Sequence, residues 1–371
     1  KKIRESGNAP FFEIDKIIET LIREMEKDKE SKWSSPTLHG GEPLLLPIDS
    51  IEKILRAIHG KYNRSSIQTS GAMIKKEHIE LFKKYKTSVG ISIDGLRAET
   101  NAGRWNAKGF NAAEMTDRTL HAMMLLKEAK IETSIITILR RCNAGTAPLR
   151  NELIDFASTM RIEYGALTFR FNPLIAFDDR TRRDEELQND QIAAAFRKLA
   201  IAAFAGDFKY YPMRDFAASM KGENAECAFG ECDPWSTDSE IPILGDGSLG
   251  VCLKVGGGND GIATIRTERS RARYEMLPQI DQNYGGCKGC FWWPYCKGGC
   301  PGAGIDNDWR NRTRFCEAYK STFEFIASLS IFDPSRAGAC AQPGGHGDRA
   351  HGDSDDPKWR AEHPEWKGKH K

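Results

Sequence analysis

The chain has 371 residues, of which 40% are apolar and 29% charged, and its formal net charge is +2. This composition is typical of a soluble protein with enough residues for two domain cores. The nearly balanced charge excludes nucleic acid as an expected partner, and no apolar run is long enough to predict a membrane-spanning helix. The first residues, Lys1 to Arg4, do not have the pattern of a signal peptide.

Residues 1–205 alternate between helical and strand patterns. Apolar residues at helical spacing predict helices at 11–28, 50–59, 75–84, 112–129, 148–160 and 187–204. β-Branched or alternating runs predict strands at 36–39, 66–69, 88–93, 131–139 and 166–171. This alternation is typical of parallel βα units. Because five strands are too few to close an eight-stranded barrel, we expect an α/β fold built on a partial, TIM-like barrel.

Three polar or glycine-containing motifs follow predicted strands. They are Gly40-Gly41-Glu42-Pro43, Thr69-Ser70-Gly71 and Asp94-Gly95. In barrels of parallel strands the chemistry lies on loops at the carboxyl ends of the strands. The two adjacent glycines expose backbone carbonyls that could hold a ligand's ammonium group, while Glu42 could receive the same group or brace the loop. Taken alone, the first motif is equally typical of an ordinary polar connection.

Residues 206–332 hold eight of the ten cysteines. Cys287, Cys290, Cys296 and Cys300 form a C-x2-C-x5-C-x3-C motif, which Cys316 follows and which Cys227, Cys232 and Cys252 precede. Disulfides are disfavoured, because closely spaced C-x2-C pairs make poor structural bridges. Two structural zinc sites or two four-cysteine iron–sulfur clusters would each use eight thiolates. The long gaps and the many glycines favour clusters, which are larger than one ion and are approached closely by backbone.

The same region is therefore predicted to be a small, loop-dominated domain held by its metals and closed by a helix at 315–332. Residues 333–371 have no apolar period and are predicted to be a flexible tail, which carries Cys340. The tail's four histidines could bind a metal adventitiously. Cys142 is predicted to be a structural thiol. Eight thiolates kept for metal indicate a reducing, cytoplasmic location.

The spacing of Cys232, Gly247, Cys252 and the later cysteines resembles the SPASM domain, the auxiliary-cluster extension of radical S-adenosylmethionine (SAM) peptide-modifying enzymes. Gly40-Gly41-Glu42 resembles the GGE motif of the same enzymes. The resemblance implies a partial (β/α)6 radical SAM barrel at 1–205, a SPASM domain with two auxiliary [4Fe-4S] clusters at 206–332, and the tail at 333–371. It implies cluster ligands in two sets: Cys227, Cys232, Cys252 and Cys300, and then Cys287, Cys290, Cys296 and Cys316. With every iron ligated, the resemblance favours electron transfer over substrate binding at these clusters.

The resemblance also implies contacts to SAM. Ser92 and Arg104 would bind the SAM carboxylate, and Gln68 and Thr69 would lie near the ribose. The positions implied to bind SAM are Gly40, Gly41, Glu42, Gln68, Thr69, Ser92, Asp94 and Arg104. Phe169 and Phe171 would flank the adenine or belong to the core, and an aromatic alternating along a strand favours the core. No catalytic base can be assigned from the pattern; the weak candidates are His39, Asp233 and Asp246.

One element of the family is missing. A C-x3-C-x2-C loop should hold the cluster that binds SAM, yet only Cys142 precedes Cys227. The first strand of the family's barrel is missing as well. Both absences are explained together if the printed sequence begins just after the cluster loop, and we expect that loop upstream of Lys1. The rival interpretation is a catalytically silent relative that has lost the loop.

The resemblance implies a radical SAM peptide maturase. A 5′-deoxyadenosyl radical would abstract hydrogen from a ribosomal peptide, and a side-chain cross-link, either a C–C cyclophane or a thioether, would form. A reduced flavodoxin or ferredoxin would donate the electron. Sulfatase maturases place an aspartate base after the cysteine that matches Cys252, and Leu253 stands there instead, which disfavours that oxidation. The alternatives are a silent peptide-binding relative, an anaerobic sulfatase-maturase-type oxidase and, from another class, a zinc-binding interaction module.

Overall fold

The computed structural model describes residues 12–30, 35–105, 109–206, 208–230, 232, 241–250, 252–256 and 273–329. All of them belong to one compact unit that spans residues 1–332, while residues 333–371 are assigned to a second unit. The tail, Cys340 and the four tail histidines therefore lie outside the described residues. Within the described ranges, no helix combines the length and the apolar character that crossing a bilayer requires.

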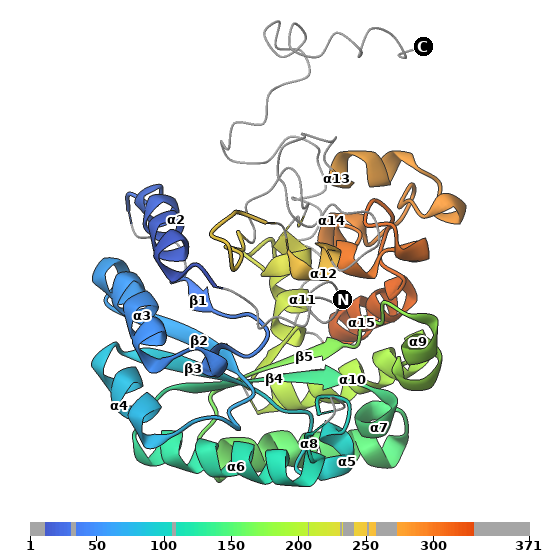
Figure 1. Cartoon of the computed structure of the whole chain (residues 1–371). Coiled ribbons are helices and arrows are strands. Elements are labelled where there is room, and N and C mark those ends of the chain that lie inside the picture. Colours follow the sequence, from blue (N-terminus) through green and yellow to red (C-terminus); the bar gives the residue numbers. More distant parts are fainter. Residues whose placement is uncertain are drawn as a thin grey trace, which may run out of the picture. The chain divides into compact units, whose positions relative to one another are not determined.

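The centre of the fold is an open sheet of six parallel strands, which lie side by side in the order of the sequence (Figure 1). The strands are β1 Thr37–Leu38, β2 Ser65–Thr69, β3 Thr87–Ser92, β4 Thr133–Leu139, β5 Thr168–Pro173 and β6 Lys209–Tyr211. Each strand pairs in parallel with the next. The predicted α/β class and the parallel sheet are confirmed. The sequence did not reveal β6, because three residues are too few to show an alternating pattern.

Five long helices cover one face of this sheet (Figure 1). The long helices of the barrel half are α2 Ile14–Glu26, α3 Ile48–Tyr62, α4 Lys76–Lys84, α6 Ala112–Glu128, α8 Ala147–Ile162 and α10 Asn189–Ala205. All but α2 send buried apolar side chains into the core that packs on the sheet. Shorter helices are α5 Ala98–Asn101, α7 Arg141–Ala144, α9 Asp179–Glu185 and α11 Met213–Met220. Local chemistry fixes the helix ends: the Asn111 side chain caps α6 by accepting from the Ala113 and Glu114 amides.

The two faces of the sheet differ in polarity. On β2 every second residue is buried, and the intervening Ser66 and Gln68 are polar and only partly buried. Because alternate strand residues point to opposite faces, one face packs on the helices and the other carries polar side chains. Phe169 and Phe171 lie on the packed face, where both rings contact Tyr210. The two phenylalanines therefore belong to the core.

The cysteine-rich region consists mostly of one-turn elements. They are η2 Cys227–Gly230, α12 Leu253–Gly256, α13 Arg273–Met276, η4 Leu277–Gln279, η5 Gln282–Tyr284, α14 Trp293–Cys296, η6 Pro301–Ala303 and η7 Ile305–Asn307. The predicted closing helix is present as α15 Cys316–Ser328, which packs along α10. Aromatic rings join the two: Phe216 on α11 contacts Phe196 on α10 and both Tyr319 and Phe323 on α15. Burial of these rings attaches the cysteine-rich region to the sheet half.

Candidate active site and metal centres

The loop after β1 is braced by Glu42. Its carboxylate accepts hydrogen bonds from Thr69 Oγ1 at 2.5 Å, the Ser70 amide at 2.9 Å, Ser70 Oγ at 2.5 Å and the Leu44 amide at 3.2 Å. These bonds tie the carboxyl end of β1 to the carboxyl end of β2. Of the two roles that the sequence left open for Glu42, bracing the loop is the one that these contacts show. Thr69 is likewise engaged within the chain.

Gly40 and Gly41 are exposed beside this brace. A Cβ atom added to either glycine would meet no atom within 4 Å. The backbone of both residues therefore faces open space. A ligand has room to approach the carbonyls and amides of the two glycines. His39, which precedes them, is also exposed.

Gln68 and Ser92 meet on the polar face of the sheet. Gln68 Nε2 donates to Ser92 Oγ at 2.9 Å, across the position of Gly90 on β3. A Cβ atom at Gly90 would lie only 2.0 Å from Gln68 Oε1. Glycine at this position is therefore what allows the Gln68 side chain to lie across the strand and reach Ser92.

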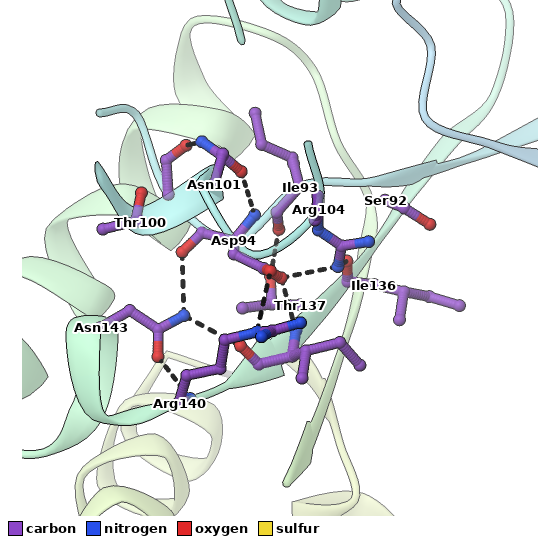
Figure 2. A network of polar contacts seen from close by, with 12 residues as sticks. Ser92, Ile93, Asp94, Thr100, Asn101, Arg104, Ile136, Thr137, Arg140 and Asn143 are labelled. Atoms are coloured by element: carbon purple, nitrogen blue, oxygen red, sulfur yellow. Dashed lines mark hydrogen bonds and ion pairs between the residues drawn. The ribbon is translucent and has the colours of Figure 1, made fainter. Parts of the chain in front are cut away.

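Asp94 is the centre of a buried polar network at the carboxyl ends of β3 and β4 (Figure 2). Its Oδ1 accepts from Arg104 Nη2 at 2.6 Å and from the Ile138 amide at 2.7 Å. Arg140 Nε lies 3.9 Å from Oδ2. The Asp94 side chain is fully buried. A buried carboxylate needs such partners, so Asp94 organises the ends of these two strands.

Arg104 is held in place by this network. Besides Asp94, its Nη2 donates to the Ile136 carbonyl at 3.3 Å. Ile136 is the residue that pairs with Ser92 between β3 and β4, so Arg104 reaches the strand position next to Ser92. The structure thus brings Ser92 and Arg104 to neighbouring positions, and Asp94 fixes the orientation of the guanidinium.

One set of four cysteines borders a single cavity. Cys287, Cys290, Cys296 and Cys316 line it together with Trp292, Trp293, Gly298, Arg312, Thr313 and Lys320. Burial raises the pKa of Cys287 to about 12, and the neighbouring Cys316 and Cys290 add to the shift. Burial likewise raises the pKa of Cys296. Thiols this crowded give up their protons when a metal centre binds, and the cavity between them offers it space.

Two of the other four cysteines, Cys300 and Cys227, lie near the buried Tyr319, as does Cys296 of the cavity set. Cys300 and Cys227 both affect the pKa of the buried Tyr319, which desolvation raises most strongly. The helix that follows Cys252, α12, packs on η6, which follows Cys300. Gly302 makes this approach possible, because a Cβ atom there would lie 2.7 Å from the Lys254 carbonyl oxygen. Among the described residues, no three His, Cys, Asp or Glu side chains are close enough to chelate a single metal ion.

Gly247, the glycine of the cysteine spacing, forms the turn of a short hairpin closed by an Ile243–Leu249 bridge. Its φ of +82° is a left-handed conformation that favours glycine, and a Cβ atom would lie 2.8 Å from Lys16 Cβ. The Gly247 carbonyl accepts from Thr20 Oγ1 at 2.7 Å. The glycine therefore lets the cysteine-rich region dock on α2.

Three ion pairs that sequence reasoning missed, made by two arginines, attach cysteine-bearing segments to the barrel. Arg314 donates to both carboxylate oxygens of Glu186 at 2.9 and 2.7 Å, two residues before Cys316. Arg170 on β5 pairs with Asp215 at 3.2 Å and with Glu226, which immediately precedes Cys227. The only sequence signal was a charged residue close to a cysteine, which is too common to be informative.

Two of the three weak base candidates, His39 and Asp246, lie within the described residues. Asp246 is exposed, and its carboxylate accepts from the amide and the hydroxyl of Ser248 at 2.9 and 2.6 Å. These bonds lower the pKa of Asp246 and show a turn-forming carboxylate. Asp233 lies outside the described residues.

Comparisons with known proteins agree with this geometry. Residues 6–144 match the sequence model of the radical SAM superfamily. The chain carries a radical SAM domain, and it is an enzyme. SAM and iron–sulfur clusters are the cofactors of this superfamily. The expectation of a radical SAM enzyme is confirmed.

Several relatives are anaerobic sulfatase-maturating enzymes. The cysteine-type enzyme of Clostridium perfringens (strain 13 / Type A) is 22% identical over 349 residues, which cover 87% of this chain and 90% of the relative. That of Clostridium novyi (strain NT) is 24% identical over 330 residues, covering 83% and 84%. The radical SAM chain is thus related to sulfatase maturases along most of its length.

Solved structures share the fold. Native anSMEcpe with bound AdoMet and Cp18Cys peptide has a TM-score of 0.61 and 17% identity, over 88% of this chain and 91% of that one. Streptococcus suis SuiB bound to precursor peptide SuiA has a TM-score of 0.53 and 19% identity, over 81% and 69%. Both of those structures hold a peptide.

Proposed function

We propose that the chain is a peptide-modifying radical SAM enzyme that binds SAM at the carboxyl ends of β1 to β4 and two auxiliary clusters in its cysteine-rich region. The observation that carries this proposal is the set of four cysteines around one cavity, in the same compact unit as a braced, open-faced Gly-Gly-Glu loop. When bound and reduced, SAM supplies a carbon radical that can take a hydrogen atom from a substrate.

Each residue of the SAM site has a proposed task. The open backbone of Gly40 and Gly41 binds the ammonium of SAM, and Glu42 keeps that backbone in place through its bonds to β2. Ser92 and Arg104 bind the SAM carboxylate from adjacent strand positions, with Asp94 orienting the guanidinium. Gln68 and Thr69 line the ribose.

The eight cysteines are proposed to ligate two [4Fe-4S] clusters. Cys287, Cys290, Cys296 and Cys316 would ligate the cluster at the cavity, and Cys227, Cys232, Cys252 and Cys300 would ligate the other. Thiolate ligation of both clusters would require a reducing compartment such as the cytoplasm. A flavodoxin or ferredoxin would deliver electrons, and the auxiliary clusters would pass on the electron left on the oxidised peptide.

The reaction itself is proposed to be a side-chain cross-link in a ribosomal peptide. Leu253, in place of the aspartate that sulfatase maturases carry after the corresponding cysteine, supports this choice. The relatedness to anaerobic sulfatase-maturating enzymes along most of the chain supports a second candidate, the oxidation of a cysteine or serine in a protein substrate.

The test is to purify the protein anaerobically, measure iron and sulfide, and incubate it with dithionite, SAM and candidate peptides. We expect two auxiliary clusters, and we expect SAM cleavage where the cluster of the C-x3-C-x2-C loop is also present. A product that has lost two hydrogen atoms and does not react with an aldehyde reagent supports the cross-link, whereas an aldehyde supports the sulfatase-type oxidation. Bound zinc without sulfide would overturn the proposal, and SAM binding without cleavage would indicate a silent relative.

A further inference from the structure

Arg273, the first residue of α13, is buried in the cysteine-rich region with only 2% of its surface exposed. Its guanidinium donates to backbone carbonyls of Lys297 at 3.4 Å, Gly298 at 2.9 Å, Gly299 at 3.1 Å and Asn311 at 2.8 Å. Three of these four carbonyls belong to one short loop. Arg273 therefore holds that loop in a single conformation.

The loop at 297–299 connects the two cysteine sets. It begins after Cys296, which borders the cavity, and ends at Cys300, which belongs to the other set. Its glycines have φ values of +77° and +67°, and a Cβ atom at Gly298 would lie 3.3 and 3.4 Å from the terminal guanidinium nitrogens of Arg273. Glycine thus lets the loop carbonyls converge on the cation.

The charge of Arg273 acts on both cysteine sets. Burial lowers the pKa of Arg273, and the interactions that counter this most strongly come from Cys300, Cys232, Cys287 and Cys296, two from each set. A buried cation is costly unless negative charge lies near it, and carbonyl oxygens carry only partial charge. Thiolates that ligate a metal centre supply such charge, so the buried arginine fits a region that binds anionic clusters.

We propose that Arg273 is a positioning residue shared by both auxiliary clusters, where it clamps the loop that carries one ligand of each cluster and raises the reduction potential of both. This inference rests on the proposed function, since it takes the eight cysteines as cluster ligands. A fixed positive charge stabilises the reduced, more negative form of a cluster. Arginine suits both tasks, because its planar guanidinium offers several donors at fixed angles and keeps its charge when buried.

The experiment compares Arg273→Met, which keeps much of the volume and removes the charge, with Arg273→Lys, which keeps the charge and loses the fork of donors. Arg312→Met is the matched control. Arg312 lines the cavity and donates to the carbonyls of Gln282 and Gly286, so it neighbours only one cysteine set. Redox titrations followed by electron paramagnetic resonance measure the midpoint potential of each auxiliary cluster in the anaerobically purified proteins.

We expect Arg273→Met to lower both potentials, with the ratio of reduced to oxidised cluster falling about tenfold at a fixed potential, or about 59 mV for one electron. Arg273→Lys should keep both potentials nearer the original, and Arg312→Met should shift only one. Unchanged potentials in Arg273→Met, or equal shifts in the Lys and Met variants, would overturn the inference.

Cluster loss is itself informative in these variants. If Arg273→Met loses iron, retention of both clusters in Arg273→Lys supports a role of the charge, and equal loss in both variants contradicts it. Measurements on the unmodified protein distinguish a failure of the role proposed for Arg273 from a failure of the proposed function. Clusters present with insensitive potentials would refute only the role of Arg273, whereas unmodified protein without clusters would refute the proposed function.

Discussion

The sheet half and the cysteine-rich region are stabilised by different interactions. The sheet half has six paired strands and long helices that pack around the main apolar core, to which α15 also contributes. The cysteine-rich region has one-turn elements before α15, and Arg273 and Arg312 hold its loops through carbonyl oxygens. Burial of apolar surface can stabilise the first region by itself, whereas the second gains much of its order from the metal centres that we propose there.

This difference predicts that the two regions respond differently to loss of a ligand. In Cys296→Ala a buried thiol of the cavity set is removed, and we expect the loss of about four irons per chain because a four-cysteine cluster needs every ligand. We then expect a protease to cut the cysteine-rich region first. The circular dichroism signal from the helices and strands of the sheet half should persist. Cys142→Ala, on α7, is the control and should keep all iron. Full iron content in Cys296→Ala would contradict the ligand set.

The ion pair of Glu186 and Arg314 lies at the junction between the two regions, and it should be nearly as sensitive to substitution. Glu186 accepts both donors of Arg314 and also the Ala176 amide, and its side chain is 7% exposed. Glu186→Gln removes the negative charge and leaves the largely buried Arg314 guanidinium without a charged partner, which should cost about 3 kcal/mol of folding free energy. Chemical denaturation measures this loss.

Iron analysis then shows whether the junction also supports the cluster. We expect Glu186→Gln to lose iron, because Arg314 lies two residues before Cys316. Glu317→Gln is the matched control, since Glu317 pairs with Lys320 at 3.1 Å and is 65% exposed, so it should change stability by less than about 1 kcal/mol. Equal stability in the two variants would show that the buried pair is not what holds this segment.

The two regions also differed in how far sequence predicted them. Long apolar periods placed the helices and five strands of the sheet, because burial imposes a regular spacing on them. The three-residue strand β6 has no room for such a period. In the cysteine-rich region the spacing identified which residues gather, but the contacts among them depend on single arginines and glycines, such as Arg273 and Gly302, that no periodic pattern marks.

The SAM site shows the same limit. The Gly-Gly-Glu motif predicted the position of the loop, and Ser92 and Arg104 do lie at neighbouring positions. The sequence could not show that Asp94 holds Arg104 or that Glu42 is bound by four donors, since these partners come from separate strands. Whether these residues bind SAM stays a prediction.

A substitution on the polar face of the sheet should weaken SAM binding and leave the stability of the fold nearly unchanged. Gly90→Ala places a methyl group against Gln68, whose flexible end can move away but then loses its bond to Ser92. We expect SAM to bind about tenfold more weakly, equal to about 1.4 kcal/mol, with little change in melting temperature. Isothermal titration calorimetry measures the affinity. Ser88→Ala, on the same strand and face, should leave the affinity for SAM unchanged. An unaltered affinity in Gly90→Ala would show that Gln68 and Ser92 do not contribute to SAM binding.

The smallest effect concerns the packed face. The Tyr210 hydroxyl is buried without a hydrogen-bond partner in the part of the chain that the structure describes, and burial raises the pKa of Tyr210 to about 12. Tyr210→Phe keeps the ring contacts with Phe169 and Phe171 and removes the unpaired group, so stability should rise by about 1 kcal/mol.

The pH dependence of stability tests the same group independently. The unfolded phenol ionises near the ordinary pKa of 10.0, while the folded phenol stays neutral up to about 12. Between these values the original protein therefore loses stability as pH rises, by about 1.4 kcal/mol per pH unit, and Tyr210→Phe lacks this contribution. Denaturation at several alkaline pH values measures the difference. Tyr284→Phe, at an exposed position, should match the original protein, and a destabilised Tyr210→Phe would show that the hydroxyl is bonded after all.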